Sequence, residues 1–545
     1  MEPAEIVATW ERWDAERSAV KHHVQEIYEY CLPRRATVTR RRPEGEPLHE
    51  ELYDSTAERA AERFATGLYN FMWNPARANF MLLPPIEHTP SAADAARPLL
   101  AVSDRINEEV GRSNFDEAFY EVALDLGTAG SATLEAGPGE RSLYEFTPHP
   151  FEAVVFAQDR RGRVDTVLRK FAWPAREIVA EFGESACPAS IRAAYHSDRL
   201  SERDKAFEIV HATVPRTRYG LGARDVRNLP VTSDWVSVTD KHLLRASGWP
   251  ELRYLVCRLT KGTGEKHGRS CGSTALPDIK MVNRIEETII CAGEQVVRPQ
   301  ILAPDNSFLG TVRLGPGDLL WYRVNTFDPS VKPEPFNSGA RVDWGVEYAE
   351  TKRVIIKQAF YNDLFLILSD DKRRTATEVR SLLAEKLAML GPNFGRMKVE
   401  LFDPLIRILL SILGEVPFYL QGLPLAYLRL AQVRYISTLA IAMQYAELGL
   451  IQDALLFLSP LAEIQPDVFD HISFDELVRG FLQKMAWPAK WLKSVDEVRA
   501  LREARSRFQA QQLAVELARE QQGVALPQTR RAEAGSPASA WMEAA

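Results

Sequence analysis

A proline-rich stretch between two helical patterns places the strongest limit on how this chain folds. The prolines within residues 298–345 are Pro299, Pro304, Pro316, Pro329, Pro333 and Pro335. Because proline inside a helix removes a hydrogen bond and clashes with the preceding turn, no long helix is expected there. The flanking segments, "LPDIKMVNRIEETIICAGEQVV" and "VEYAETKRVIIKQAFYNDLFLIL", have helical patterns, and Pro277 is expected in the first turn of the former. Two helices around a loop-rich or strand-rich insert predict a helical hairpin with a small module at its tip.

Three consecutive cations, Lys372, Arg373 and Arg374, follow the second of these helices within the segment "SDDKRRTATEV". Thr375 and Glu378 then have the spacing of a capping box, which predicts that another helix begins there. The cations are therefore expected in a short loop held at both ends. The whole chain carries a formal net charge of −7, so any contact with nucleic acid is expected to be local.

The N-terminal part of the chain is predicted to be helical. Residues 4–31 have the pattern of one amphipathic helix that is stopped by Pro33. A further helix is expected after Ser55, which has capping-box spacing to Glu58.

The sequence pattern changes from helical to strand-like between about residues 143 and 260, and "RRGR" in this region predicts a hairpin. Residues 376–500 are mostly helical in pattern, and a polar, alanine-rich helix follows from 496 to about 522. The last residues have the composition of a mobile tail. The predicted fold class is therefore α+β with helices predominating, and 545 residues suggest two or more structural units.

The segment "GTGEKHGRS", residues 262–270, comes nearest to a nucleotide-binding motif. A phosphate-binding loop needs four residues between its glycines and then lysine followed by serine or threonine. Here Gly264 and Gly268 are separated by three residues, Gly262 and Gly268 by five, and Arg269 stands in place of lysine. The spacing therefore argues against a nucleotide site.

The sequence shows no recognisable catalytic or metal-binding arrangement. The histidines form no HExxH or Cys/His cluster, and Asp370 with Asp371 is interpreted as surface charge before a helix. The five cysteines lack CxxC spacing and are interpreted as small core residues of a protein made in a reducing compartment. No metal, cofactor, signal peptide or membrane span is expected.

Five stretches of the chain form a recognisable series. They are, in order, "YDSTAERAAERFATGLYNFMWNP", "FDEAFYEVALDLGTAGSATLEAG", "FTPHPFEAVVFAQDRRGRVDTVLRKF", "GRSCGSTALPDIKMVNRIEETI" and "TATEVRSLLAEKLAMLGPNFGRMKVELFDPLIRILLSILGEVP". This series resembles the head-to-tail connector, or portal, proteins of T7-like short-tailed bacteriophages. It spans about residues 50 to 417 in the family's order, and "ALPDIKMVN" and "TATEV" are its most specific parts.

The resemblance implies a portal-type fold assembled as a ring of about twelve copies around a channel. The segments that it implies are a wing over 1–273, a first stem helix over 274–297, a clip over 298–343, a second stem helix over 344–367, a tunnel loop over 368–375, a long wing helix over 376–415, a helical crown over 416–522 and a flexible tail over 523–545.

The resemblance also implies a function and partners. The ring would form the channel at one capsid vertex of the virion, through which double-stranded DNA is packaged and ejected, after synthesis of the chain in the host cytoplasm. Its partners would be the terminase large subunit, the scaffold and major capsid proteins, internal core proteins, and a tail adaptor or nozzle, with no membrane. The chain itself would be structural, and ATP hydrolysis would belong to the motor.

Two sets of site residues are implied. Lys372, Arg373 and Arg374 would face the DNA backbone from the tunnel loop, where phosphate attraction does not depend on sequence; alternatively, they pair with neighbouring carboxylates such as Asp370 and Asp371. The aromatic candidates in the clip, for ring contacts or partner docking, are Phe308, Trp321, Tyr322, Phe327 and Phe336.

Two other functions are compatible with the residues alone. One is a DNA-packaging enzyme with an atypical nucleotide site, which would show DNA-stimulated ATP hydrolysis lost on changing Arg269. The other is a helical adaptor that forms no ring, which native mass or negative-stain images would distinguish from a portal.

Overall fold

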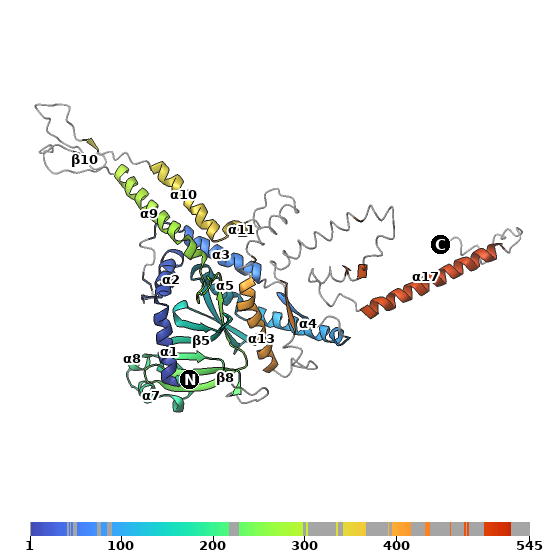
Figure 1. Cartoon of the computed structure of the whole chain (residues 1–545), viewed down its shortest axis with the longest axis horizontal. Coiled ribbons are helices and arrows are strands. Elements are labelled where there is room, and N and C mark those ends of the chain that lie inside the picture. The colour runs from blue at the N-terminus through green and yellow to red at the C-terminus, as the bar shows by residue number, and fades with distance from the viewer. Residues whose placement is uncertain are drawn as a thin grey trace, which may run out of the picture. The chain divides into compact units, whose positions relative to one another are not determined.

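The computed structural model (Figure 1) describes residues 2–40, 43, 45–46, 52–73, 78–83, 90–216, 228–297, 301–302, 334–335, 342–366, 391, 395–415, 431–436, 458, 473–475, 477–478 and 495–524. The chain divides into two units, Met1–His471 and Ile472–Ala545. The first contains a mixed helix and sheet fold, and the second contains one long helix, α17 (Val495–Val524). The expectation of α+β structure in more than one unit is therefore confirmed.

The N-terminal helix is divided at Arg17, where one continuous helix over 4–31 was expected. The two parts are α1 (Pro3–Glu16) and α2 (Ser18–Cys31). The Arg17 side chain is buried, and its guanidinium donates hydrogen bonds to the carbonyl oxygens of Phe151, Glu152 and Val154 at 2.8, 2.6 and 2.7 Å. The chain bends here because a buried guanidinium must satisfy its donors. Leu32 ends α2 before Pro33, as predicted.

Helices α3 (Thr56–Met72) and α5 (Phe115–Thr128) form the centre of the main core. Helix α3 begins where the capping pattern placed it, but the Ser55 side chain makes no capping hydrogen bond. Instead, Asp54 Oδ1 accepts the backbone N–H of Thr56 at 2.7 Å. The expected capping box is therefore wrong, because the preceding aspartate takes its place.

A five-stranded antiparallel sheet in the order β4-β5-β6-β7-β8 confirms the strands predicted between 143 and 260. The strands are β4 (Val154–Gln158), β5 (Val164–Pro174), β6 (Ala206–Thr213), β7 (Val231–Ser237) and β8 (His242–Trp249). The "RRGR" turn joins β4 and β5, with Gly162 at φ 78°.

Alternating residues of β6 cover the two faces of this sheet. Val210 and Ala212 pack with Ile6 and Val7 of α1 on one face. Phe207 and Ile209 pack on the other face against α6 (Ala175–Phe182) and α7 (Ala189–Tyr195). The period of two along a strand therefore gives the sheet a helical layer on each side.

A three-stranded sheet in the order β3-β2-β9 packs beside the five-stranded one. Its strands are β2 (Ser131–Pro138), β3 (Tyr144–His149) and β9 (Tyr254–Arg258). A buried polar network joins the sheets: His211 on β6 lies 2.7 Å from the Tyr254 hydroxyl, and His149 lies 2.8 Å from Glu135, which also accepts a hydrogen bond from Arg169 of β5. Burial lowers the pKa of His211 to about 3, so this imidazole stays neutral.

The helical hairpin predicted from the sequence consists of α9 (Cys271–Val297) and α10 (Val342–Ala359), followed by the short α11 (Asn362–Leu366). Helix α9 begins at Cys271, so Pro277 lies in its interior and not in its first turn. The helix expected over 344–367 is interrupted at Tyr361, whose φ is 55°. Helix α11, after the interruption, packs against α3, as α10 does before it.

The described part of the chain contains further elements. They are η1 (Pro33–Arg35), β1 (Phe80–Leu83), α4 (Pro90–Gly111), η2 (Phe151–Ala153), η3 (Glu184–Ala186), α8 (Leu200–Arg203), β10 (Ile301–Leu302), β11 (Glu334–Pro335), the π-helix η5 (Lys398–Phe402), α13 (Asp403–Glu415) and β12 (Gln432–Tyr435). Strand β1 pairs with β12, so a segment far along the chain returns to the N-terminal part.

Four of the five cysteines are buried, as interpreted from the sequence: Cys31, Cys187, Cys257 and Cys271. Cys291 is exposed on α9, so the interpretation as a core residue is wrong for this position.

Candidate functional site

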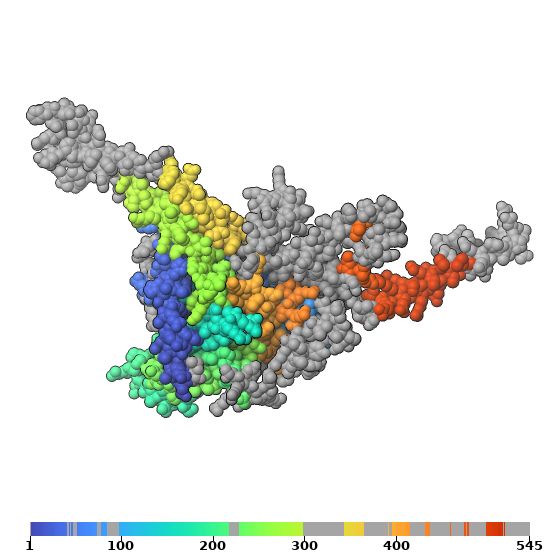
Figure 2. Space-filling model, in the orientation of Figure 1, coloured from blue at the N-terminus to red at the C-terminus, as the bar shows by residue number. Residues whose placement is uncertain are grey.

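Helices α9 and α10 form a stem that stands on the mixed core, and this stem is the first part of the candidate site. Figures 1 and 2 show the two helices side by side, green beside yellow. Ion pairs cross between them: Lys352 of α10 lies 2.8 Å from Asp278 of α9, and Arg353 pairs with Glu286. Arg353 also reaches Asp54 at the start of α3, at 2.8 Å. The stem is therefore held as a pair and fastened to the core at α3.

One side of the stem is apolar and exposed. Around the N-terminus of α10, a groove of about 540 Å³ is lined mainly by the two helices, including Met281, Ile285 and Ile289 of α9 and Trp344 of α10. Trp344 is 66% exposed and stacks on Tyr348 with ring centres 5.3 Å apart. The other large apolar side chains exposed on the stem are Ile290, Val296, Val297, Val346, Val354 and Ile355. An exposed apolar groove of the kind that Trp344 and Met281 line marks a contact with another molecule.

At the base of the stem, the backbone at Gly268 lies very close to the backbone at Gly130. A Cβ on Gly268 would lie 2.1 Å from the carbonyl oxygen of Gly130, which itself has φ 80°. The N–H of Gly268 donates to the hydroxyl of Ser131 at 2.8 Å. Ser270 then caps α9, since its hydroxyl accepts the N–H of Ser273 at 2.8 Å. This cap explains why α9 begins before Pro277.

The same segment does not form a phosphate loop. Its backbone N–H groups are used internally: Gly262 donates to the Glu265 carboxylate, Glu265 to the Gly262 carbonyl, and Arg269 to the Thr260 carbonyl. The Arg269 guanidinium is paired with Glu265 at 2.5 Å. Because these donors already have partners, the segment offers no anion cradle.

A buried ion pair beneath the stem joins four segments of the chain. The Arg258 side chain is 1% exposed; its Nε and Nη2 atoms donate to Glu400 at 3.0 and 2.5 Å. Arg258 also donates to the carbonyl oxygens of Lys266 and Gly162 at 3.1 and 3.0 Å. Glu400 lies in the π-helix η5, so this pair joins the chain that follows the three predicted cations to β9 and to the base of α9. The partners are far apart in sequence, and the only sequence signal was an arginine at the end of an apolar strand.

The predicted tunnel-loop cations, Lys372, Arg373 and Arg374, lie outside the described residues, as do Asp370 and Asp371. The structure describes the chain on both sides of them. Before them, Phe360 and Leu364 are buried in the main core; after them, Met397, Leu401 and Phe402 are buried in the same core. Phe402 stacks parallel to Trp73, with ring centres 6.3 Å apart.

The predicted clip aromatics, Phe308, Trp321, Tyr322, Phe327 and Phe336, also lie outside the described residues. Near the two ends of the insert, β10 and β11 pair antiparallel, with Ile301 opposite Pro335 and Leu302 opposite Glu334. The insert therefore leaves and returns at one place, as a module at the tip of a hairpin requires.

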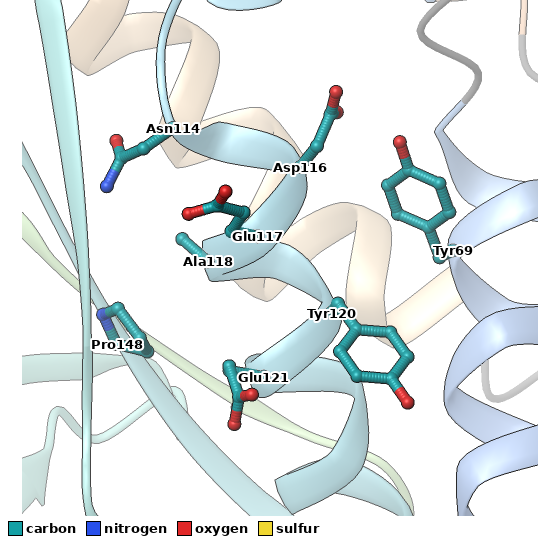
Figure 3. Close-up of a pocket in the computed structure, with 8 residues that line it drawn as sticks. All are labelled: Tyr69, Asn114, Asp116, Glu117, Ala118, Tyr120, Glu121 and Pro148. Carbon is teal, nitrogen blue, oxygen red and sulfur yellow. The ribbon is translucent and has the colours of Figure 1, made fainter.

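A pocket of about 630 Å³ on the outer face of α5 contains none of the predicted site residues. Figure 3 shows Tyr69 of α3 beside Asp116, and Glu117 and Glu121 on successive turns of α5. Burial raises the pKa of Asp116. Asp116 and Glu117 lie in the first turn of α5, where negative charge stabilises a helix, so their presence has a structural explanation.

Within the described part of the chain, no group of three or more His, Cys, Asp or Glu side chains is placed to hold a metal ion. None of the described helices is long and apolar enough to cross a bilayer. The features that stand out are thus a stem with an apolar side and a core that fixes both ends of the segment carrying the three cations.

Comparison with known proteins identifies the chain. A family model described as "Bacteriophage head to tail connecting protein" matches residues 4–492, so the chain belongs to this family. It is 25% identical over 505 residues to the portal protein of Salmonella phage epsilon15, with 90% of this chain and 89% of that protein covered. It is 27% identical over 536 residues to the probable portal protein of Bordetella phage BPP-1, with 94% and 92% covered. The function of the chain is accordingly that of a phage portal, or head–tail connector.

Among solved structures, a chain from the "Virion of native gene transfer agent (GTA) particle" aligns with 81% of this chain and 95% of its own length, at 13% identity and a TM-score of 0.31. A score this low does not establish a common fold. The resemblance noted from the sequence is confirmed by the family match, and neither the packaging enzyme nor the adaptor is favoured.

Proposed function

We propose that the chain assembles as a closed ring of about twelve copies at one capsid vertex, with double-stranded DNA passing through the central channel. The observation that carries this proposal is the exposed apolar side of the stem. A lone chain would leave Trp344 and its neighbours in water, whereas a ring covers the same surface on every copy. Native mass spectrometry or negative-stain images of the purified chain test the proposal, and monomers or open oligomers would contradict it.

The stem groove should determine ring stability. Trp344→Ser is expected to weaken each subunit contact by about 2 kcal/mol, because a large aromatic side chain in an interface commonly contributes this much. The fold of the chain should be unchanged, since Trp344 is mostly exposed in the single chain. Glu294→Gln, an exposed polar change on α9, is the control. Rings that dissociate at the same dilution in both variants would show that the groove is not an interface.

Lys372, Arg373 and Arg374 are the residues that would contact the DNA phosphates. Repeated around a ring, they provide tens of positive charges at one level of the channel, which attracts phosphates without reading sequence. Because the chain as a whole is net acidic, the duplex would be held at this ring of cations and would slide along the rest of the channel.

Replacing all three cations with alanine is expected to leave rings intact and to lower the amount of DNA retained per particle severalfold, because the phosphate contacts are lost. Quantitative DNA content of purified particles is the measurement. The matched control replaces Arg160, Arg161 and Arg163, three exposed arginines of the β4–β5 turn, and should retain DNA normally. Equal DNA content in the two triple variants would contradict the role of the loop.

The partner set follows from this position in the virion. The clip, with Phe308, Trp321, Tyr322, Phe327 and Phe336, would dock the terminase large subunit during packaging and the tail adaptor or nozzle afterwards. The scaffold, major capsid and internal core proteins would contact the rest of the ring. The role of the chain is structural, with no cofactor, and nucleotide hydrolysis is assigned to the motor.

A further inference from the structure

Two buried cysteines lie where the end of α2 meets the start of α9. Cys31 is the last residue of α2, and Cys271 is the first residue of α9. Both belong to the main core, where they are 0% and 5% exposed. Two thiols that are brought together from distant parts of the sequence are candidates for a covalent bond.

The helices that carry these cysteines are in direct contact. A Cβ on Gly272, the residue after Cys271, would lie 2.7 Å from the Cγ2 atom of Ile27 on α2. A larger residue at this position would therefore push the two helices apart. Cys31 follows Ile27 by four residues, so it lies one turn further along the same face of α2. The same face of α2 thus carries Cys31 and meets the first turn of α9.

Two further observations place the thiols close together. Nε2 of His23, on the same face of α2 as Ile27, lies 2.9 Å from the Ser273 hydroxyl of α9. Burial raises the pKa of Cys31 to about 12, and the charge of the neighbouring Cys271 adds to this rise. Since Coulomb interactions weaken with separation, this influence requires that the two groups lie near each other.

We propose that Cys31 and Cys271 form a disulfide bond once the protein is outside the reducing interior of the host. A phage portal is a component of the virion, and disulfides form and persist under the oxidising conditions at virion surfaces. In the first step, the thiolate of one cysteine attacks a low-molecular-weight disulfide and releases one small thiol. The other cysteine then attacks this mixed disulfide and releases the second small thiol. The two protein thiols lose two electrons and two protons, and both pass to the small disulfide.

Burial makes this reaction slow. The attacking species is the thiolate, and burial raises the pKa of both Cys31 and Cys271 to about 12. Exchange therefore waits for rare openings of the contact between α2 and α9, so the chain folds and assembles with free thiols. The later bond would fasten the base of the stem to α2 and restrict the unfolded chain. This timing rests on the synthesis in the host cytoplasm that the proposed function includes, whereas the bond itself does not.

Oxidation of the purified full-length chain tests the bond. A Cys291→Ser background removes the exposed thiol, and the folded chain is incubated with oxidised glutathione. Free thiols are then blocked with a maleimide, and the digested chain is analysed by mass spectrometry. The expected product is one cross-linked peptide pair that contains Cys31 and Cys271. The midpoint of thermal unfolding should rise by a few degrees relative to a sample kept in dithiothreitol.

Single substitutions give the matched controls. Cys31→Ala or Cys271→Ala should abolish the cross-link and the response of the midpoint to oxidation. Cys187→Ala should change neither, because Cys187 is also buried but lies in a separate core cluster. The proposal would be overturned by a link that forms only in urea, by a link from either thiol to Cys257, or by two free thiols after prolonged oxidation.

The timing is tested on particles treated with maleimide at the moment of collection. Released virions should contain the disulfide, and heads taken from infected cells should contain the free thiols. Free thiols in released virions would overturn the proposal, and the disulfide in both samples would overturn the timing. If the purified chain formed no ring, the proposed function would fail while the disulfide stood, because both cysteines belong to one copy.

Discussion

Alanine at position 258 is expected to destabilise the chain by roughly 3–5 kcal/mol, the cost of breaking a buried ion pair from one side. The Arg258 guanidinium is almost fully buried and serves Glu400 and two carbonyl oxygens. Without it, the Glu400 carboxylate loses its charge partner and the two carbonyl oxygens lose their hydrogen-bond donors in a site with little water. The fall in the midpoint of thermal unfolding, measured by calorimetry at one protein concentration, reports the loss.

A double variant separates the ion pair from simple loss of packing. Arg258→Met with Glu400→Leu should be more stable than Arg258→Ala, because replacing both partners leaves no charge unpaired. Glu16→Gln removes a half-exposed pair with Lys266 at 3.4 Å and should change stability by no more than about 1 kcal/mol. If Arg258→Ala matched this surface control, the pair would not hold the π-helix to the core.

Gly268→Ala is expected to cost about 3 kcal/mol, at the upper end for inserting one methyl group into a packed site. The added Cβ would lie 2.1 Å from the Gly130 carbonyl oxygen and 3.1 Å from the Arg258 Cβ. Neither the backbone nor the buried arginine can withdraw easily, so the base of α9 must separate from β2. Urea unfolding followed by tryptophan fluorescence measures the change in stability.

The control for this substitution is Gly137→Ala in strand β2, where an added Cβ meets nothing within 4 Å. It should be neutral or slightly stabilising, since alanine reduces the freedom of the unfolded chain. A Gly268→Ala variant as stable as Gly137→Ala would mean that the two backbones do not approach as closely as described.

Local patterns predicted most of the elements correctly. The prolines of 298–345 and the helical patterns around them indicated the hairpin of α9 and α10, and "RRGR" indicated the turn between β4 and β5. These signals succeed because helix and strand periods, turn residues and prolines act over a few neighbouring positions. Where they failed, at Arg17 and Ser55, a distant carbonyl or an adjacent carboxylate offered a better hydrogen bond.

The site was predictable only in part. Arg258 and Glu400 are 142 residues apart in sequence, and no local pattern connects them. The three cations and the clip aromatics came from the spacing before Thr375 and from family resemblance, and they remain predictions. The helical spacing of Met281 and Ile285, together with Trp344, was a weak sequence signal for the stem groove. Periodicity alone does not distinguish a helix face that is buried within the chain from one that another molecule covers.

The burial of both flanks of the segment that carries Lys372, Arg373 and Arg374 has a mechanical consequence. Phe360 and Leu364 before the segment, and Leu401 and Phe402 after it, enter the same aromatic core. A force on the intervening residues would therefore load two anchors in parallel and pass into this core, instead of acting on a single helix end. Two anchors in one core would resist such a force better than a single anchor.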